Sequence, residues 1–286
     1  MSEKGRRKME GIEVGKIPIE VLVSIKQEVL SFSVGLVALV AEGQRGIPYL
    51  IGSGTLIQLD DFFAVLTANH VFEKTVYTHR KCEYLGVTVG SAVHRIMLPK
   101  VELQVTRIGG TDVLPKSPDL AIVKIPKERL GDISARKSFW NIGKYEKLVL
   151  PSPMSIDAGV WALCGCPDVN TTGPTAMQGF DHVWTYQMLA GFSGVDREWT
   201  SGEFDYLQYS VSYSHGNNTP LTFGGVSGGG LWQVPLEKGK DGTVRHQRAI
   251  LSGVAFYETA IESGERSIIC HGRRSIYEHV HAKMSR

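Results

Sequence analysis

The sequence predicts an all-β protein, and three observations lead to this expectation. The chain has 286 residues, which is enough for one or two domains with a sizeable core. It contains 32 glycines and 12 prolines, which divide the chain with frequent turn signals. Between these signals short apolar and alternating segments recur, and this pattern is typical of strands in a barrel or a sandwich.

The expected strands fall into two groups, 31–125 and 156–272, and a charged, proline-bounded connector separates them at 126–155. The candidate strands are Val34–Val40, Tyr49–Gln58, Phe63–Thr67, Tyr84–Val89, Val101–Ile108, Leu120–Ile125, Val160–Cys164, His182–Leu189, Tyr206–Tyr213, Gly229–Val234 and Gln247–Phe256.

Two helices are expected outside these groups. The N-terminal extension, residues 1–30, contains Pro18–Leu30, where apolar residues recur at helical spacing and proline stands near the start. The C-terminal segment, residues 273–286, contains Ser275–Met284, which also has apolar residues four apart.

Charge and apolar patterning exclude several classes of protein. Lys+Arg number 31 and Asp+Glu 29, a net charge of +2, so we expect neither a general nucleic-acid binder nor a membrane-surface protein. No run approaches the roughly 18 consecutive apolar residues of a membrane span. The basic start of the chain leads into a mixed segment and not into an apolar signal core, so secretion through a cleaved peptide is not expected.

The four cysteines favour a reducing compartment. Cys82, Cys164, Cys166 and Cys270 form neither the paired CxxC pattern of a zinc site nor a Cys-x-x-Cys redox motif. Free cysteine packs as a small apolar group, so we expect four reduced and mostly buried thiols. The sequence therefore predicts a cytoplasmic protein without disulfides, metal or other cofactor.

Three segments carry chemistry when they are taken together. Leu-Thr-Ala-Asn-His-Val brings His70 to the end of an expected strand, and Ser-Pro-Asp-Leu-Ala-Ile-Val places Asp119 at the start of another. Phe-Gly-Gly-Val-Ser-Gly-Gly-Gly-Leu-Trp sets Ser227 among glycines. A serine hydroxyl needs a base such as imidazole to become a nucleophile, and a buried carboxylate can orient that imidazole. Glycines around the serine let the N–H groups of Gly225 and Ser227 approach a developing oxyanion.

These segments resemble the T-A-x-H, D-[LI]-A-[LIV] and G-x-S-G-G signatures of trypsin-like serine peptidases with the chymotrypsin fold. The segment Ile-Gly-Ser-Gly-Thr-Leu-Ile at 51–57 is similar to the family strand before the histidine loop, and the match spans about residues 34–258. The resemblance implies a double β-barrel with the active site between the barrels. The first barrel, 31–125, would supply His70 as the base and Asp119 as its orienting carboxylate. The second barrel, 156–272, would supply Ser227 as the nucleophile.

The resemblance also implies a substrate pocket. The residue six positions before the nucleophile would form its base, and an edge strand would form its far wall and pair with the substrate. The implied substrate-binding residues are Leu221, Val254, Ala255, Phe256 and Tyr257. They predict cleavage after small or medium apolar residues. Phe256 also stands where many members have a serine that supports the catalytic carboxylate, so we expect a different group to support Asp119.

The sequence leaves alternatives to an active serine endopeptidase acting on a protein or peptide substrate. Val226 replaces the aspartate that pairs with a freed N-terminus in zymogen activation, so one alternative is a peptidase held latent until an activating partner protein orders its oxyanion loop. Another is an inactive trypsin-like fold that serves as a binding or scaffold module. Taken singly, Ser227 is also consistent with a turn serine and Asp119 with a residue that starts a strand.

Overall fold

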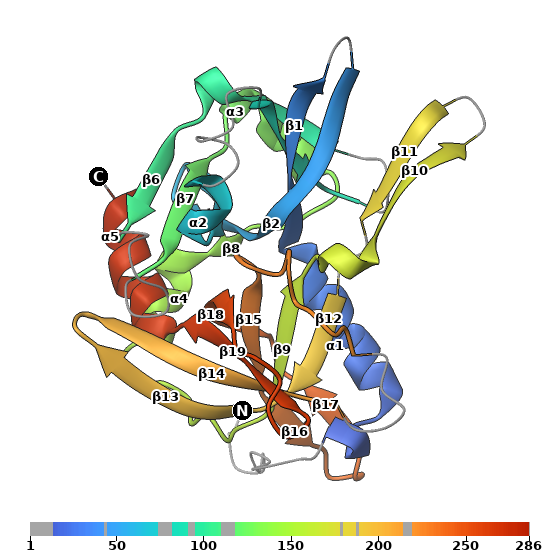
Figure 1. Ribbon diagram of the computed structural model, residues 1–286. Helices are drawn as coiled ribbons and strands as arrows, with labels where there is room; N and C mark the ends of the chain where they lie inside the picture. Colours follow the sequence, from blue (N-terminus) through green and yellow to red (C-terminus); the bar gives the residue numbers. More distant parts are fainter. Residues whose placement is uncertain are drawn as a thin grey trace.

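The structure, a computed structural model, is mostly β (Figure 1). It describes residues 14–42, 45–73, 82–90, 95–109, 118–177, 180–186, 189–213 and 219–285. Residues 1–13 of the predicted N-terminal extension therefore lie outside the described residues. No helix within the described ranges is long and apolar enough to cross a membrane.

The first large sheet has the strand order β5-β4-β1-β2-β3-β7-β6, in which every neighbouring pair is antiparallel, and β8 pairs with β2 in parallel. Its strands are β1 (Ser33–Glu42), β2 (Arg45–Leu59), β3 (Phe62–Thr67), β4 (Cys82–Thr88), β5 (Arg95–Pro99), β6 (Val105–Ile108), β7 (Leu120–Lys124) and β8 (Trp140–Asn141). The apolar run at the start of β7 is buried on both faces. The pairing of β3 with β7 places the end of β3 beside the start of β7, as shown by the partners Thr67 and Ala121.

The second large sheet is antiparallel, with the order β12-β9-β15-β18-β19-β14-β13. Its strands are β9 (Val160–Gly165), β12 (Leu189–Ser193), β13 (Val195–Ser201), β14 (Phe204–Ser212), β15 (Gly230–Val234), β18 (Ile250–Glu258) and β19 (Glu265–His271). Strands β9 and β15 are buried along their whole length. Strand β19 was not among the predicted strands, because its first half is polar and only its last four residues are buried.

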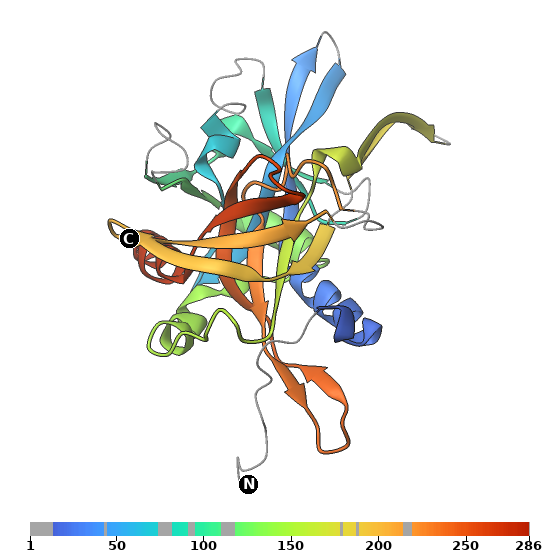
Figure 2. The ribbon, with the colours of Figure 1, turned by 60° about the horizontal axis from the view of Figure 1, so that its bottom comes forward.

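Two small hairpins project from the body of the molecule. One consists of β10 (Thr171–Met177) and β11 (Phe180–Tyr186), and the other of β16 (Leu236–Lys238) and β17 (Val244–His246) (Figures 1 and 2). The predicted strand His182–Leu189 corresponds to the end of β11 and the first residue of β12.

Both predicted terminal helices are present, but their bounds or helix type differ from the prediction. Helix α1 spans Ile19–Ser31 and buries residues spaced four apart. The C-terminal segment is a π-helical turn over Ser275–Val280 followed by α5 (His281–Met284). Short 3₁₀ turns also occur at Val14–Lys16, Lys100–Glu102 and Asp168–Asn170.

The segment predicted as a connector contains regular structure that the sequence analysis missed. Helix α3 spans Lys127–Ser134 and α4 spans Ile142–Val149, and β8 lies between them. The Asn141 side chain accepts a hydrogen bond from the Lys144 N–H at 2.7 Å and caps α4. These short helices contain many charged residues, which made their apolar face hard to recognise in the sequence. In α4 this face includes the buried Tyr145.

An aromatic cluster around Trp140 packs the connector against the second sheet. The Trp140 ring stacks on Tyr145 at 3.8 Å between centroids. It meets the rings of Phe32 and Trp232 edge to face at 5.6 and 5.2 Å. Its Nε1 donates to the Tyr277 hydroxyl at 3.0 Å. The fully buried Trp140 side chain thus contacts Phe32 before β1, Trp232 of the second sheet and Tyr277 of the C-terminal segment.

The cysteine prediction is confirmed. All four cysteines are buried and none is in a disulfide. Burial raises the pKa of both Cys164 and Cys166 to about 12, so these thiols stay protonated near neutral pH.

We expect Trp140→Ala to lower the free energy of unfolding by about 3–5 kcal/mol, because it leaves a large cavity and removes the hydrogen bond that the Tyr277 hydroxyl accepts. Leu148→Ala is the matched control, since Leu148 lies on α4 but is 60% exposed, and it should change stability by about 0.5 kcal/mol or less. Urea unfolding measures both. A loss below about 1 kcal/mol for Trp140→Ala would contradict this packing.

Candidate active site

His70 lies on α2 (Asn69–Phe72), the single helical turn that follows β3. Its side chain is 19% exposed, and its ring Nδ1 is 2.5 Å from Oδ2 of Asp119. The His70 backbone N–H donates to the other oxygen, Oδ1 of Asp119, at 2.9 Å. The two oxygens of one carboxylate therefore fix both the ring and the backbone of His70.

Asp119 is fully buried and directly precedes β7. Because β7 pairs with β3, the residue before β7 comes to lie beside the turn that follows β3, which is where His70 stands. A carboxylate at Nδ1 favours the tautomer with the proton on Nδ1, which leaves Nε2 free to accept a proton. This arrangement is that of a base with its orienting group.

His271, at the end of β19, supports Asp119 from the side of the second sheet. The Asp119 backbone N–H donates to Nε2 of His271 at 3.0 Å, and the His271 ring stacks on Phe256 at 4.3 Å. A nitrogen that accepts this bond carries no proton, so the ring is neutral. Burial lowers the pKa of His271 to about 3, although the charge of Asp119 opposes the shift. His271 could not be identified from the sequence, because no local sequence pattern distinguishes it from other strand residues.

Ser227 lies in the glycine-rich turn that precedes β15, and two glycines in it have backbone conformations that side chains rarely adopt. Gly225 has φ +83° and Gly228 has φ +88°. A Cβ on Gly228 would lie 2.0 Å from Oγ1 of Thr67, so the turn packs directly against the end of β3. The Gly228 N–H donates to the Ala255 carbonyl at 2.7 Å, which ties the turn to β18.

The N–H groups of Gly225 and Ser227 have no acceptor among the residues that the structure describes. The Gly224 carbonyl accepts from the Asp168 N–H at 2.8 Å, and the Val226 carbonyl accepts from the Gly229 N–H at 2.8 Å. In a trans peptide the C=O and N–H point in opposite directions, so the N–H groups of Gly225 and Ser227 point away from these contacts. Both donors are free to bind a ligand oxygen.

A cavity of about 300 Å³ is lined by both His70 and Ser227. Of the predicted triad, the structure joins His70 to Asp119 through hydrogen bonds and brings Ser227 into the cavity beside His70. Within the described part of the chain, no hydrogen bond joins Ser227 to the His70 ring. Such contacts often tighten only when substrate binds.

The predicted substrate-binding residues divide into two sets. Ala255, Phe256 and Tyr257 line the cavity. Val254 is fully buried in β18, and Leu221 is 74% exposed and is not among the residues that line the cavity.

Phe223, Glu258 and Ile268 also line the cavity. The Glu258 carboxylate accepts from the Phe223 N–H at 2.8 Å and forms an ion pair with Arg266 at 2.7 Å. Its charge is therefore already compensated. Phe223 stands four residues before Ser227 and Glu258 directly follows Tyr257, whereas Ile268 lies on β19, which was not predicted as a strand.

Comparisons with known proteins do not assign a family. No protein-family model matches the chain, and no curated protein matches it. One solved structure that is similar comes from work on the aromatic interactions that drive the coupled folding and binding of the intrinsically disordered Sesbania mosaic virus VPg protein. It is 13% identical, with 87% of this chain and 90% of that chain covered and a TM-score of 0.42. This likeness carries no conclusion about function, and the fit of the antiparallel sheets to a chymotrypsin-like fold rests on the structure itself.

The neutral state of His271 predicts a specific loss of stability in acid. Its pKa is lowered in the folded state, so the unfolded chain binds the extra proton between pH about 6.5 and about 3. Stability from this group is complete above about pH 6.5 and falls by up to about 1.4 kcal/mol per pH unit as the pH drops toward 3.

Urea unfolding of the wild type and His271→Gln across this range measures the effect. The difference between the two proteins should shrink as the pH falls, because the variant lacks the titrating ring. His279→Gln, the same change in the C-terminal segment, is the control. An equal difference at pH 7 and at pH 4.5 would rule out a buried neutral His271.

Proposed function

We propose that this protein is a serine endopeptidase that hydrolyses peptide bonds through an acyl-enzyme. The observation that carries the proposal is the Asp119 carboxylate bound to both the Nδ1 and the backbone N–H of His70, whose ring shares one cavity with Ser227. The two large sheets support the double barrel that the resemblance implies, since the first supplies His70 and Asp119 and the second supplies Ser227.

In the proposed reaction Nε2 of His70 takes the proton of the Ser227 hydroxyl while Oγ forms a bond to the substrate carbonyl carbon. The N–H groups of Gly225 and Ser227 hold the resulting oxyanion. Asp119 stabilises the imidazolium, which then gives its proton to the leaving amine as the C–N bond breaks. Water attacks the acyl-enzyme, again with His70 as the base, and releases the acid and the free serine.

The free N–H groups of Gly225 and Ser227 support a competent site over the latent alternative. In a latent site of this kind a reversed peptide would direct a carbonyl, and not the Gly225 N–H, toward the oxyanion position. Here the bond from Asp168 to the Gly224 carbonyl opposes that reversal. All three triad residue types are present, which also favours an enzyme over a scaffold module.

A fluorophosphonate probe should label the purified protein at Ser227, and Ser227→Ala should abolish labelling, since the probe reacts only with an activated serine. Ser134→Ala, on the exposed side of α3, should label at the wild-type rate. Peptide mapping by mass spectrometry identifies the labelled residue. Absence of labelling in a folded protein would contradict the proposal.

Peptide-library profiling should find cleavage after small or medium apolar residues. Phe223, Phe256 and Ile268 give the cavity apolar walls, and Arg266 already compensates Glu258. A substrate Lys or Arg would therefore bury a charge without a free partner.

Arg266→Gln provides an internal test of this specificity, because it frees the Glu258 carboxylate and should increase cleavage after Lys and Arg relative to the wild type. Dominant cleavage after basic residues by the wild-type protein would overturn the pocket assignment without affecting the triad.

A further inference from the structure

A second cavity, of about 740 Å³, lies apart from the candidate active site, and none of the triad residues lines it. Its wall includes the end of α4, the segment 152–158, and residues near the adjoining ends of β15 and β18. Much of the wall is apolar, from Tyr145, Leu148, Val149, Pro153, Met154 and Ile250. A cavity of this volume is in the range that holds a small organic molecule.

Arg273 lines this cavity and is only 4% exposed. Its Nη1 donates to the Met154 carbonyl at 2.8 Å, its Nη2 to Oε1 of Gln233, and its Nε to the Ser252 hydroxyl at 3.3 Å. All three acceptors are neutral, and no carboxylate among the described residues forms an ion pair with Arg273. The Arg273 guanidinium lies 5.8 Å from the centre of the Trp161 ring, but burying a cation that forms no ion pair is still costly.

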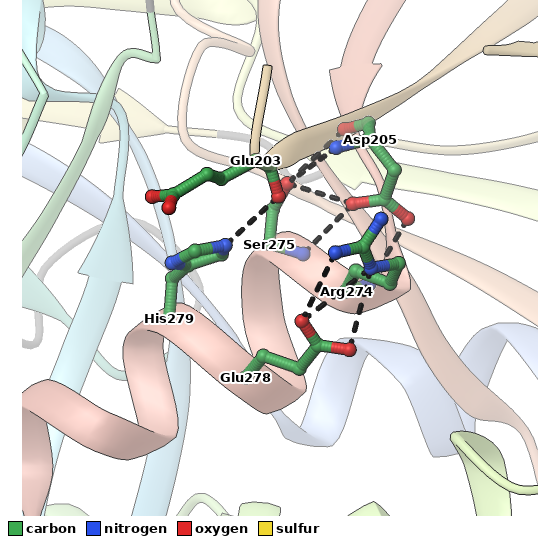
Figure 3. A network of polar contacts seen from close by, with 6 residues as sticks. All are labelled: Glu203, Asp205, Arg274, Ser275, Glu278 and His279. Atoms are coloured by element: carbon green, nitrogen blue, oxygen red, sulfur yellow. Dashed lines mark hydrogen bonds and ion pairs between the residues drawn. The ribbon is translucent and has the colours of Figure 1, made fainter. Parts of the chain in front are cut away.

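The charges of Glu198 and Asp205 act on Arg273, and Figure 3 shows that Asp205 is engaged by other donors. The Asp205 carboxylate accepts from the backbone N–H groups of Arg274 and Ser275 at 2.9 and 2.7 Å. The Arg274 side chain pairs with Glu278 at 3.3 Å on the exposed side of the segment. Two consecutive arginines therefore differ, because Arg274 forms an ion pair with a carboxylate and Arg273 forms none with the described residues.

The other charges around the cavity leave its lining net positive. Arg248 also lines the cavity, with its guanidinium 5.6 Å from the centre of the Tyr145 ring. The carboxylate nearest to Arg248, Glu28 at 3.9 Å, is not a lining residue. Asp157 is the acidic residue of the lining, so two guanidinium groups stand against one carboxylate.

We propose that this cavity binds an anionic small molecule, with a phosphate or carboxylate held by Arg273 and an aromatic or apolar body against the wall. A guanidinium has five N–H groups, and three of those on Arg273 donate to the protein, so one on Nη1 and one on Nη2 remain. This planar pair matches the spacing of oxygens in phosphates and carboxylates. Arg248, although it pairs with Glu28 at 3.9 Å, places a second guanidinium in the lining.

The ligand class is tested with three probes of similar size and different charge, phenyl phosphate, phenol and benzylamine, by isothermal titration calorimetry at constant ionic strength. Phenyl phosphate should bind at millimolar concentrations or below, and the neutral and cationic probes about tenfold or more weakly. Benzoate in place of phenyl phosphate separates carboxylate from phosphate preference. Equal binding of all three probes, or none, would overturn the proposal.

Variants locate the binding. Leu148→Trp should fill the cavity from an exposed position and weaken phenyl phosphate binding about tenfold or more. Ile19→Trp, the same change at a 71% exposed apolar residue away from the cavity, should leave it unchanged. Arg273→Gln should abolish binding, and if that variant does not fold, Leu148→Trp decides alone. Unaltered binding in Leu148→Trp would place the anion elsewhere and refute the site.

Discussion

The candidate active site depends on one buried serine, Ser53 in β2, which joins the two large sheets. Its backbone N–H donates to the Ser227 carbonyl at 2.8 Å, and its hydroxyl donates to the Gly225 carbonyl at 2.7 Å. The same hydroxyl accepts from the Cys166 N–H at 2.8 Å, and the Ser53 carbonyl accepts from the Thr67 hydroxyl at 2.6 Å. The N–H and hydroxyl groups of Ser53 are satisfied across the junction and its carbonyl within the first sheet, so a shift of one sheet against the other would cost several buried hydrogen bonds. The turn that contains Ser227 is thereby held in a fixed position relative to the end of β3 and His70.

Residues in local motifs could be predicted from the sequence, and residues that act across the fold could not. The approach of His70 to Asp119 follows from two paired apolar strands, because β3 ends shortly before His70 and β7 begins directly after Asp119. His271 contacts the Asp119 backbone although 152 positions separate the two residues in the sequence, and no local pattern predicts such a contact. The same reason hid the role of Ser53, which looked like one more small residue in a strand. Leu221 was placed by counting from the nucleophile, but the turn exposes it and brings Phe223 inward instead.

Strand β18 links the two cavities. Its later residues, Ala255–Glu258, line the cavity with Ser227, while Ile250 near its start lines the cavity with Arg273. Gln233, which lines the second cavity and bonds to Arg273, is a residue of β15, and β15 begins three residues after Ser227. Strands buried along their whole length, as β9 and β15 are, suit a sheet that holds two sites at a constant separation. The proposed anion site therefore rests on the same strands that position the proposed nucleophile, although its chemistry needs none of the triad.

If the Ser53 junction aligns Ser227 with His70, the rate of fluorophosphonate labelling at Ser227 should depend on the Ser53 hydroxyl, which Ser53→Ala removes. Ser33→Ala is the matched control, because Ser33 is equally buried in β1 and bonds to the Val29 carbonyl away from the site. Loss of the buried hydroxyl should slow labelling by about tenfold or more in Ser53→Ala, in line with about 1–3 kcal/mol for unsatisfied buried partners, while Ser33→Ala keeps the wild-type rate. A wild-type labelling rate in folded Ser53→Ala would contradict the account.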